Sequence, residues 1–208
     1  MTVLAVDTAG QKPSVALISN GRLFEEPLPD DRRASEDLLP AIRRVLASAG
    51  IRLTDCERIG VCAGPGSFTG VRVGLATVWA LGRATGIAVD PVSTLEAMAE
   101  AARLPGRERV VAALDAGRGE VVAERFELGG LRARSLGPRR LLPADALSEF
   151  AGADPVTVAP NGRTEGVAAA LARAIERSPR PVGEAGAHPG MTAVYSRPSA
   201  AEEKHGAA

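Results

Sequence analysis

Histidine and aromatic residues are scarce in this chain, and each shortage argues against a class of function. The 208 residues include two histidines and six aromatic residues, and the motifs HxxxH, HExxH and CxxC do not occur. Zinc sites in proteins are built from such closely spaced ligand pairs. Six scattered aromatic side chains do not form a platform on which nucleobases could stack. We therefore expect no metal site and no oligonucleotide-binding fold.

The sequence also lacks a net charge and a long apolar run. Lys and Arg together number 25, as do Asp and Glu, so the formal charge is zero. A protein that binds nucleic acid by itself usually carries a strongly basic surface, so we expect contact with nucleic acid to be indirect. The sequence has no run of about 18 apolar residues and no basic segment followed by an apolar one at its start. We expect a cytoplasmic protein that does not contact membranes.

The residues that nucleophilic catalysis requires are missing as well. Ser67 follows Gly-Pro-Gly and does not lie in a G-x-S-x-G elbow. Both histidines, His188 and His205, lie in the C-terminal tail. Cys56 and Cys62 have no histidine near them in the sequence, and we expect both to be buried small apolar residues. We predict that no residue of this chain is catalytic.

What the chain does contain is one series of structural elements that occurs twice. The first series has strands at 2–6, 14–19 and 22–28, a helix at 36–49, a strand at 59–63 and a helix at 71–85, followed by a strand at 87–92 and a helix from 93 or 94. The second has strands at 110–114, at 120–127 and after 130, a helix at 144–150, a strand at 156–159 and a helix at 164–176. This duplicated βββαβα order predicts two stacked α/β lobes with a cleft between them.

A polar segment at 103–109 with a Pro-Gly pair separates the two series. We therefore predict a first lobe at 1–105 and a second lobe at 106–180. The tail at 181–208 is rich in Pro, Gly and Ala, and we expect it to be loose or to return to the first lobe.

The most unusual stretch is the glycine-rich loop at 64–70, with the sequence GPGSFTG. Because it joins a strand to a helix, its backbone N–H groups could hold an anion at the helix N-terminus. The glycines could equally allow a tight turn and close packing of that helix. The loop lacks the Gly-Lys-Ser/Thr ending of a P-loop, so both interpretations stay open.

Two acidic turns lie at matching places in the two series. Asp7-Thr8 follows the first strand of the first series, and Asp115-Ala116-Gly117 follows the first strand of the second. Paired turns of this kind position magnesium and phosphates in actin-like and sugar-kinase ATPases, although ordinary turn chemistry explains them equally well. The weak phosphate-binding candidates are therefore Asp7, Thr8, Asp115, Gly117, Gly64 and Gly66.

The helix at 71–85 is apolar on nearly all sides. A sheet covers only one side of a helix, so the remainder is covered by the helix at 36–49 and the tail, or by a partner protein. We favour a partner and predict that these two helices form the docking surface, which a homodimer would use when the partner is absent. The predicted contact residues are Leu39, Ile42, Arg43, Leu46, Val73, Ala76, Thr77, Ala80 and Arg83.

The chain resembles the TsaB (YeaZ) family, which belongs to the bacterial machinery that makes threonylcarbamoyladenosine at position 37 of tRNAs reading ANN codons. The specific part of the likeness is GPGSFTGVRVGLA at 64–76 followed by VSTLEAMA at 92–99. Weaker matches along the chain are VLAVDT, SEDLLPAI, LDAGRGEVV and VYSRP. In one departure, Ala34 stands before Ser35 where many members have His.

The resemblance implies a two-lobed, actin-like ATPase (RNase H-like) fold with a reduced second lobe. It also implies that the first lobe binds TsaD, a larger homologue that holds the metal and transfers the threonylcarbamoyl group, and that the ATPase TsaE joins the pair. The chain itself would then be a non-catalytic scaffold or activator that meets tRNA indirectly. It would hold no cofactor alone, and any nucleotide would bind at the partner interface.

A second hypothesis is an enzyme in its own right, either a small-molecule kinase of the same fold or a peptidase. Such an enzyme would need a metal pair, a nucleophile or a complete nucleotide site, and the sequence has no pattern for any of them. The scaffold is therefore the favoured hypothesis.

Overall fold

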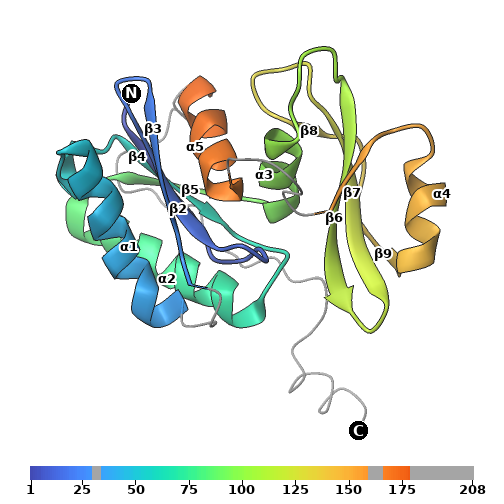
Figure 1. Cartoon of the computed structure of the whole chain (residues 1–208), viewed down its shortest axis with the longest axis horizontal. Helices are drawn as coiled ribbons and strands as arrows, with labels where there is room; N and C mark the ends of the chain where they lie inside the picture. The colour runs from blue at the N-terminus through green and yellow to red at the C-terminus, as the bar shows by residue number, and fades with distance from the viewer. Residues whose placement is uncertain (30–33, 159–165, 179–208) are drawn as a thin grey trace, which may run out of the picture.

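The computed structural model describes residues 1–29, 34–158 and 166–178. Figure 1 shows two lobes side by side, each built on one β-sheet. The predicted tail lies outside the described residues. No helix in the described ranges is both long and apolar enough to cross a membrane.

The first lobe is built on a five-stranded mixed sheet with the order β3-β2-β1-β4-β5. Strands β2 and β3 form an antiparallel hairpin. Its turn lies at Asn20 and Gly21, whose φ values of 51° and 72° fit the tight turn that this residue pair favours. This confirms the predicted hairpin. The strands are β1 (Val3–Asp7), β2 (Ser14–Ser19), β3 (Arg22–Pro27), β4 (Arg58–Cys62) and β5 (Ala88–Val92), with β4 and β5 parallel to β1.

Helices cover both faces of the first sheet. On one face lie α1 (Ala34–Ala49) and α2 (Phe68–Thr85), and on the other lies α5 (Val167–Arg177) (Figure 1). The α5 helix sits close to the sheet at Gly60, where an added Cβ would come within 2.2 Å of the Ile175 side chain. The described residues of this lobe therefore enclose an apolar core from two sides, as its strands of fully buried residues require.

The second lobe is built on a smaller sheet with the order β10-β6-β7-β8, in which β9 also pairs with β7. Side chains of β6 alternate: Val110, Ala112 and Leu114 join the main core, whereas Val111 and Ala113 pack in a small second cluster. The elements of this lobe are β6 (Arg109–Gly117), β7 (Glu120–Glu127), β8 (Arg134–Ser135), β9 (Arg140–Pro143), β10 (Val156–Val158) and α4 (Leu147–Ala151), with a short 3₁₀ turn at Ala144–Ala146. The helix α3 (Thr94–Ala101) packs against α5, β6 and β7. Another 3₁₀ turn, at Leu53–Asp55, connects α1 to β4 in the first lobe.

The helix α5 packs on the first lobe, although it follows the second lobe in the chain. The limits 1–105 and 106–180 place this helix in the second lobe, yet it packs on β1, β2 and β4 of the first sheet and beside α3. The reason is its composition: Leu171 and Ile175 are fully buried, and its run of alanines permits close approach to both neighbours. The limits themselves remain a prediction.

A buried ion pair fixes the end of α5 to the first sheet. Arg58 on β4 is 1% exposed and makes two hydrogen bonds of 2.7 Å to the carboxylate of Asp90 on β5. Its remaining Nη1 donates to the carbonyls of Ile175 and Ser178, at 3.0 and 3.3 Å. Arg58 thus neutralises its charge and satisfies carbonyl groups that a helix C-terminus leaves unpaired.

Candidate functional site

The Asp7 turn is closed by its own side chain. Asp7 ends β1, is fully buried, and its Oδ1 accepts hydrogen bonds from the backbone N–H groups of Ala9 and Gly10 at 2.9 and 3.0 Å. Burial raises the pKa of the Asp7 carboxyl above its usual value of 3.8, and the hydrogen bonds from Gly10, Ala9 and the Cys62 thiol oppose that rise. The amides that would meet a phosphate at this turn are thus already paired within the chain.

The glycine-rich loop lies directly against this turn. Ser67 N–H donates to the Ala9 carbonyl at 2.9 Å, and the Thr8 hydroxyl donates to the Gly70 carbonyl at 2.6 Å. A Cβ on Gly66 would lie 2.2 Å from the Ala9 oxygen, and one on Gly70 would lie 1.9 Å from the Thr8 oxygen. The geometry favours close packing of two backbones as the reason for these glycines.

The two acidic turns differ in their surroundings. Asp115 is exposed, and its Oδ1 accepts from the Gly117 N–H at 2.7 Å, whereas Asp7 is enclosed with Thr8 beneath the loop that carries Gly64 and Gly66. The structure thus brings four of the six phosphate-binding candidates together and leaves Asp115 and Gly117 at the tip of the other hairpin. Among the described residues, no group of three or more His, Cys, Asp or Glu could hold a metal ion.

The buried carboxyl of Asp7 makes stability depend on pH. A carboxyl whose folded pKa exceeds its unfolded pKa contributes stability that is full below the unfolded value and is lost as the pH rises through the folded value. Asp7→Asn keeps the acceptor for Ala9 and Gly10 and removes the ionisation. We expect this variant to match or exceed the parent's stability at pH 8 and to show a flatter pH dependence between about pH 4 and pH 8.

Urea unfolding at several pH values measures this effect. A variant that is less stable than the parent at pH 8 by about 2 kcal/mol or more would mean that the folded protein needs the ionised carboxylate at this turn.

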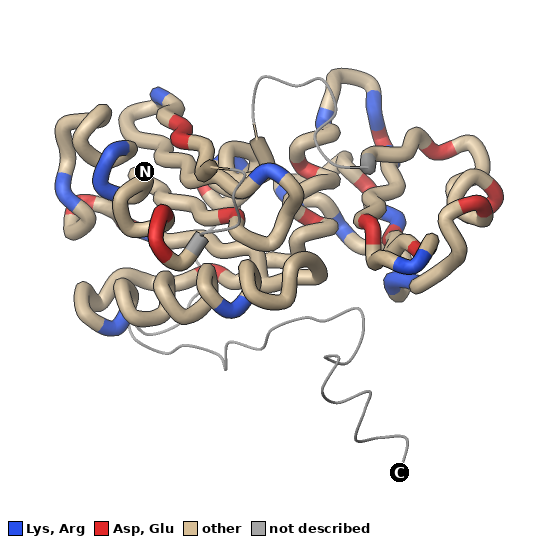
Figure 2. Tube along the Cα trace, turned by 60° about the horizontal axis from the view of Figure 1, so that its bottom comes forward, with Lys and Arg blue, Asp and Glu red and all other residues tan. Residues whose placement is uncertain are grey.

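The outer face of α2 carries two exposed aromatic side chains. Trp79 is 46% exposed and Phe68 is 36% exposed, and both Ala76 and Ala80 are exposed beside them. The charged residues of this helix are Arg72 and Arg83. The guanidinium carbon of Arg72 lies 3.7 Å from the centre of the Phe68 ring. Figure 2 shows the helix almost entirely in the colour of uncharged residues. Aromatic and arginine side chains among small residues are typical of protein-binding surfaces.

Seven of the nine predicted contact residues lie at the surface and two lie in the core. Leu39, Arg43, Ala76, Ala80 and Arg83 are exposed, and Val73 and Thr77 are half-buried.

Ile42 and Leu46 instead lie in the core, with 3% and 8% of their surface exposed. Helical spacing correctly places Ile42 and Leu46 on the apolar face of α1, but that face turns towards β2 and β3. Ile42 and Leu46 are therefore core residues, and their prediction as surface contacts is wrong.

Trp79 and Phe68 were not among the predicted contacts. The signal for Trp79 lies in the spacing, because it follows Ala76 by three residues and so shares its side of the helix. Phe68 opens α2 one turn before Arg72 and lies on the same side.

Two lobes on mixed sheets, with α3 and α5 packed against each other between them, define the class of actin-like ATPase folds (Figure 1). The family described as "TsaD: tRNA N6-adenosine threonylcarbamoyltransferase" matches residues 27–176. The chain belongs to this family, and within it to the TsaB (YeaZ) proteins.

Individual relatives agree with this assignment. The tRNA threonylcarbamoyladenosine biosynthesis protein TsaB of Escherichia coli (strain K12) is 39% identical over 122 residues, which cover 58% of this chain and 53% of that protein. The TsaB of Haemophilus influenzae is 40% identical over 122 residues, with coverages of 58% and 52%. The solved structure of YeaZ from Pseudomonas aeruginosa has 38% identity, a TM-score of 0.63 and coverages of 68% and 67%. The chain spans about half the length of the curated relatives it matches.

Proposed function

We propose that this chain is a non-catalytic subunit of the system that makes threonylcarbamoyladenosine in tRNA. In this role it binds a larger TsaD-like homologue, which carries out the transfer to adenosine 37, and a TsaE-like ATPase joins the pair. The chain meets tRNA only through that assembly and holds no cofactor or metal of its own. A nucleotide, where one is present, lies at the interface with the partner.

The observation that carries the proposal is the exposed apolar face of α2. The helix places Phe68, Ala76 and Trp79 on one exposed side, and an apolar helix face at the surface of a monomer is typical of a binding site. The face lies on the opposite side of the first sheet from α5, so it is accessible without any movement of the lobes. When the TsaD-like partner is absent, a second copy of the chain would use the same face.

The closed Asp7 turn supports a role without turnover. A kinase of this fold would use the amides of Ala9 and Gly10 to bind phosphates, but these amides bind Asp7 Oδ1 instead. A stand-alone kinase therefore finds no support in the geometry of this turn.

A charge on the α2 face tests the proposal. We expect Ala76→Glu to weaken binding to the TsaD-like homologue at least about 100-fold, because association would bury an unpaired carboxylate at a cost of about 3 kcal/mol or more. The variant should remain folded, since Ala76 is exposed in the free chain. Calorimetric titration measures the affinity, and circular dichroism measures the fold.

Ala153→Glu is the matched control, because it places the same charge on an exposed alanine of the second lobe. It should leave binding unchanged. If folded Ala76→Glu protein binds the homologue as tightly as the parent does, the docking surface lies elsewhere.

A further inference from the structure

The two lobes meet through the helices α3 and α5, which lie between the two sheets (Figure 1). The helix α3 packs on β6 and β7 of the second sheet, and α5 packs on β1, β2 and β4 of the first. Both helices are rich in alanine. Because alanine side chains form only shallow ridges on a helix, packing alone resists the sliding of one helix along the other weakly. Other contacts must therefore fix the position of α3 against α5.

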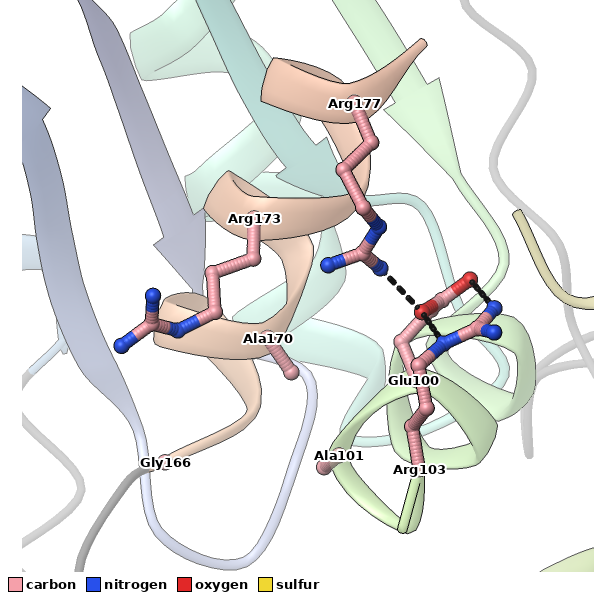
Figure 3. A pocket seen from close by; sticks show the side chains of 7 residues that line it. All are labelled: Glu100, Ala101, Arg103, Gly166, Ala170, Arg173 and Arg177. Atoms are coloured by element: carbon pink, nitrogen blue, oxygen red, sulfur yellow. Dashed lines mark hydrogen bonds and ion pairs between the residues drawn. The ribbon is translucent and has the colours of Figure 1, made fainter. Parts of the chain in front are cut away.

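The packing between the two helices is open at the C-terminal end of α3. A pocket of about 300 Å³ lies between them there, with Ala101 and Ala170 in its lining. Rigid protein interiors are close-packed, so this space leaves room for one helix to move relative to the other. Figure 3 shows that the side chains of Glu100 from α3 and Arg177 from α5 meet beside this pocket.

Glu100 connects α3 to α5 through a buried carboxylate. Its side chain is 1% exposed and accepts a hydrogen bond of 2.6 Å from Arg177. It also accepts two bonds of 3.0 Å from Arg103 and one from the Ala133 N–H. Bonds between charged groups are about twice as strong as bonds between neutral groups, and they hold their partners in a defined geometry.

The segment 128–133, which we call the strap, connects β7 to β8 in the second lobe and is bonded to both helices. Arg177 of α5 donates to the Leu131 carbonyl of the strap at 3.2 Å. Arg132 of the strap makes two hydrogen bonds, of 2.9 and 2.5 Å, to Oε1 of Glu96 on α3. These directional bonds resist a sliding movement that packing between alanines resists only weakly.

We propose that Arg177, Glu100 and the strap form a latch that fixes α3 against α5 and thereby sets the angle between the two lobes. Arg177 can act in this way because Arg58 holds the end of its helix to the first sheet, so the bonds of Arg177 pass from the first lobe to the second. Two-lobed enzymes close on their ligands by hinge or shear movements, and the latch opposes such closure. This inference goes beyond the proposed partner role and does not depend on it.

The distance between two spin labels in the full chain tests the latch. Ser48→Cys on α1 and Ser148→Cys on α4 place one nitroxide on each lobe, at two exposed positions. The native Cys56 and Cys62 are buried, and burial raises the pKa of both thiols, so they react slowly with the label. Dilution with unlabelled protein restricts the double electron–electron resonance signal to distances within one chain.

We expect a single narrow distribution of distances in the labelled parent. Arg177→Ala should widen this distribution at least about twofold, because α5 then loses its bonds to Glu100 and to the Leu131 carbonyl. Glu100 keeps Arg103 and Ala133 as partners in this variant, so the fold should remain intact, which circular dichroism measures. Arg177→Lys should restore part of the narrowing, since an ammonium group can still bind Glu100.

Arg134→Ala is the matched control for Arg177→Ala. Arg134 follows the strap directly and also makes two hydrogen bonds to one carboxylate, that of Glu127, but both residues belong to the second lobe. The distribution should therefore stay narrow. A distribution that stays narrow in Arg177→Ala would mean that packing alone fixes the lobes, and it would overturn the proposal. A broad distribution in the parent, or equal widening by Arg134→Ala, overturns it as well.

Discussion

Gly70→Ala is expected to destabilise the protein by about 3 kcal/mol or more. Alanine at an interior helix position ordinarily stabilises by about 1 kcal/mol relative to glycine, so the expected sign is reversed. The reversal arises because the new Cβ would lie 1.9 Å from the Thr8 carbonyl oxygen, a backbone atom that no rotamer change moves away. The start of α2 would have to shift, and the hydrogen bond from the Thr8 hydroxyl to Gly70 would be lost.

Urea unfolding measures the change in the free energy of unfolding. Titration with the TsaD-like homologue measures the affinity, which should fall because the displaced helix carries the docking face. Gly129→Ala is the control, since a Cβ there meets nothing within 4 Å. Gly70→Ala protein as stable as the parent would show that the loop and the Asp7 turn are not held in this close contact.

Asp90→Ala is expected to cost about 3–5 kcal/mol, because it leaves the guanidinium of Arg58 buried without its counter-charge. Arg58 is 1% exposed and cannot turn outwards to water without leaving the carbonyls of Ile175 and Ser178. The loss should therefore also loosen the end of α5. Hydrogen exchange of α5 amides, measured beside chemical unfolding, would report that local effect.

Two further variants distinguish the stability cost of the unpaired buried charge from the cost of removing any carboxylate. Glu127→Ala breaks the exposed pair with Arg134 and should cost less than about 1 kcal/mol. The double variant Arg58→Met with Asp90→Ala should recover part of the loss, because no charge then remains buried. A single variant Asp90→Ala that is no less stable than Glu127→Ala would contradict this role of the pair.

The features that follow from local chemistry were predictable from the sequence. Asn20-Gly21 fixes its hairpin because both residues adopt positive φ. The glycine-rich segment leads from a strand into a helix as predicted, but the helix begins at Phe68 and not at residue 71. The buried cysteines were also predicted and are confirmed as free and buried. Each of these depends on residues close together in the chain.

The features that depend on contacts between distant segments were not predictable in the same way. Apolar spacing in α1 shows that Ile42 shares a face with Leu46, but it does not show whether that face meets a sheet or a partner. Arg58 in an otherwise apolar strand was a signal for a buried pair, yet its partner Asp90 lies 32 residues away. The contact between α3 and α5 likewise follows only from the tertiary structure.

The return of α5 to the first sheet has a consequence for synthesis on the ribosome. The strands of that sheet are complete once residue 92 has emerged, but the helix that covers their second face comes only at 167–177. At about 5–20 residues per second, that apolar face waits roughly 4–15 seconds while the second lobe is made. During this interval the nascent chain exposes the second face of the first sheet, which becomes covered only when α5 has been made.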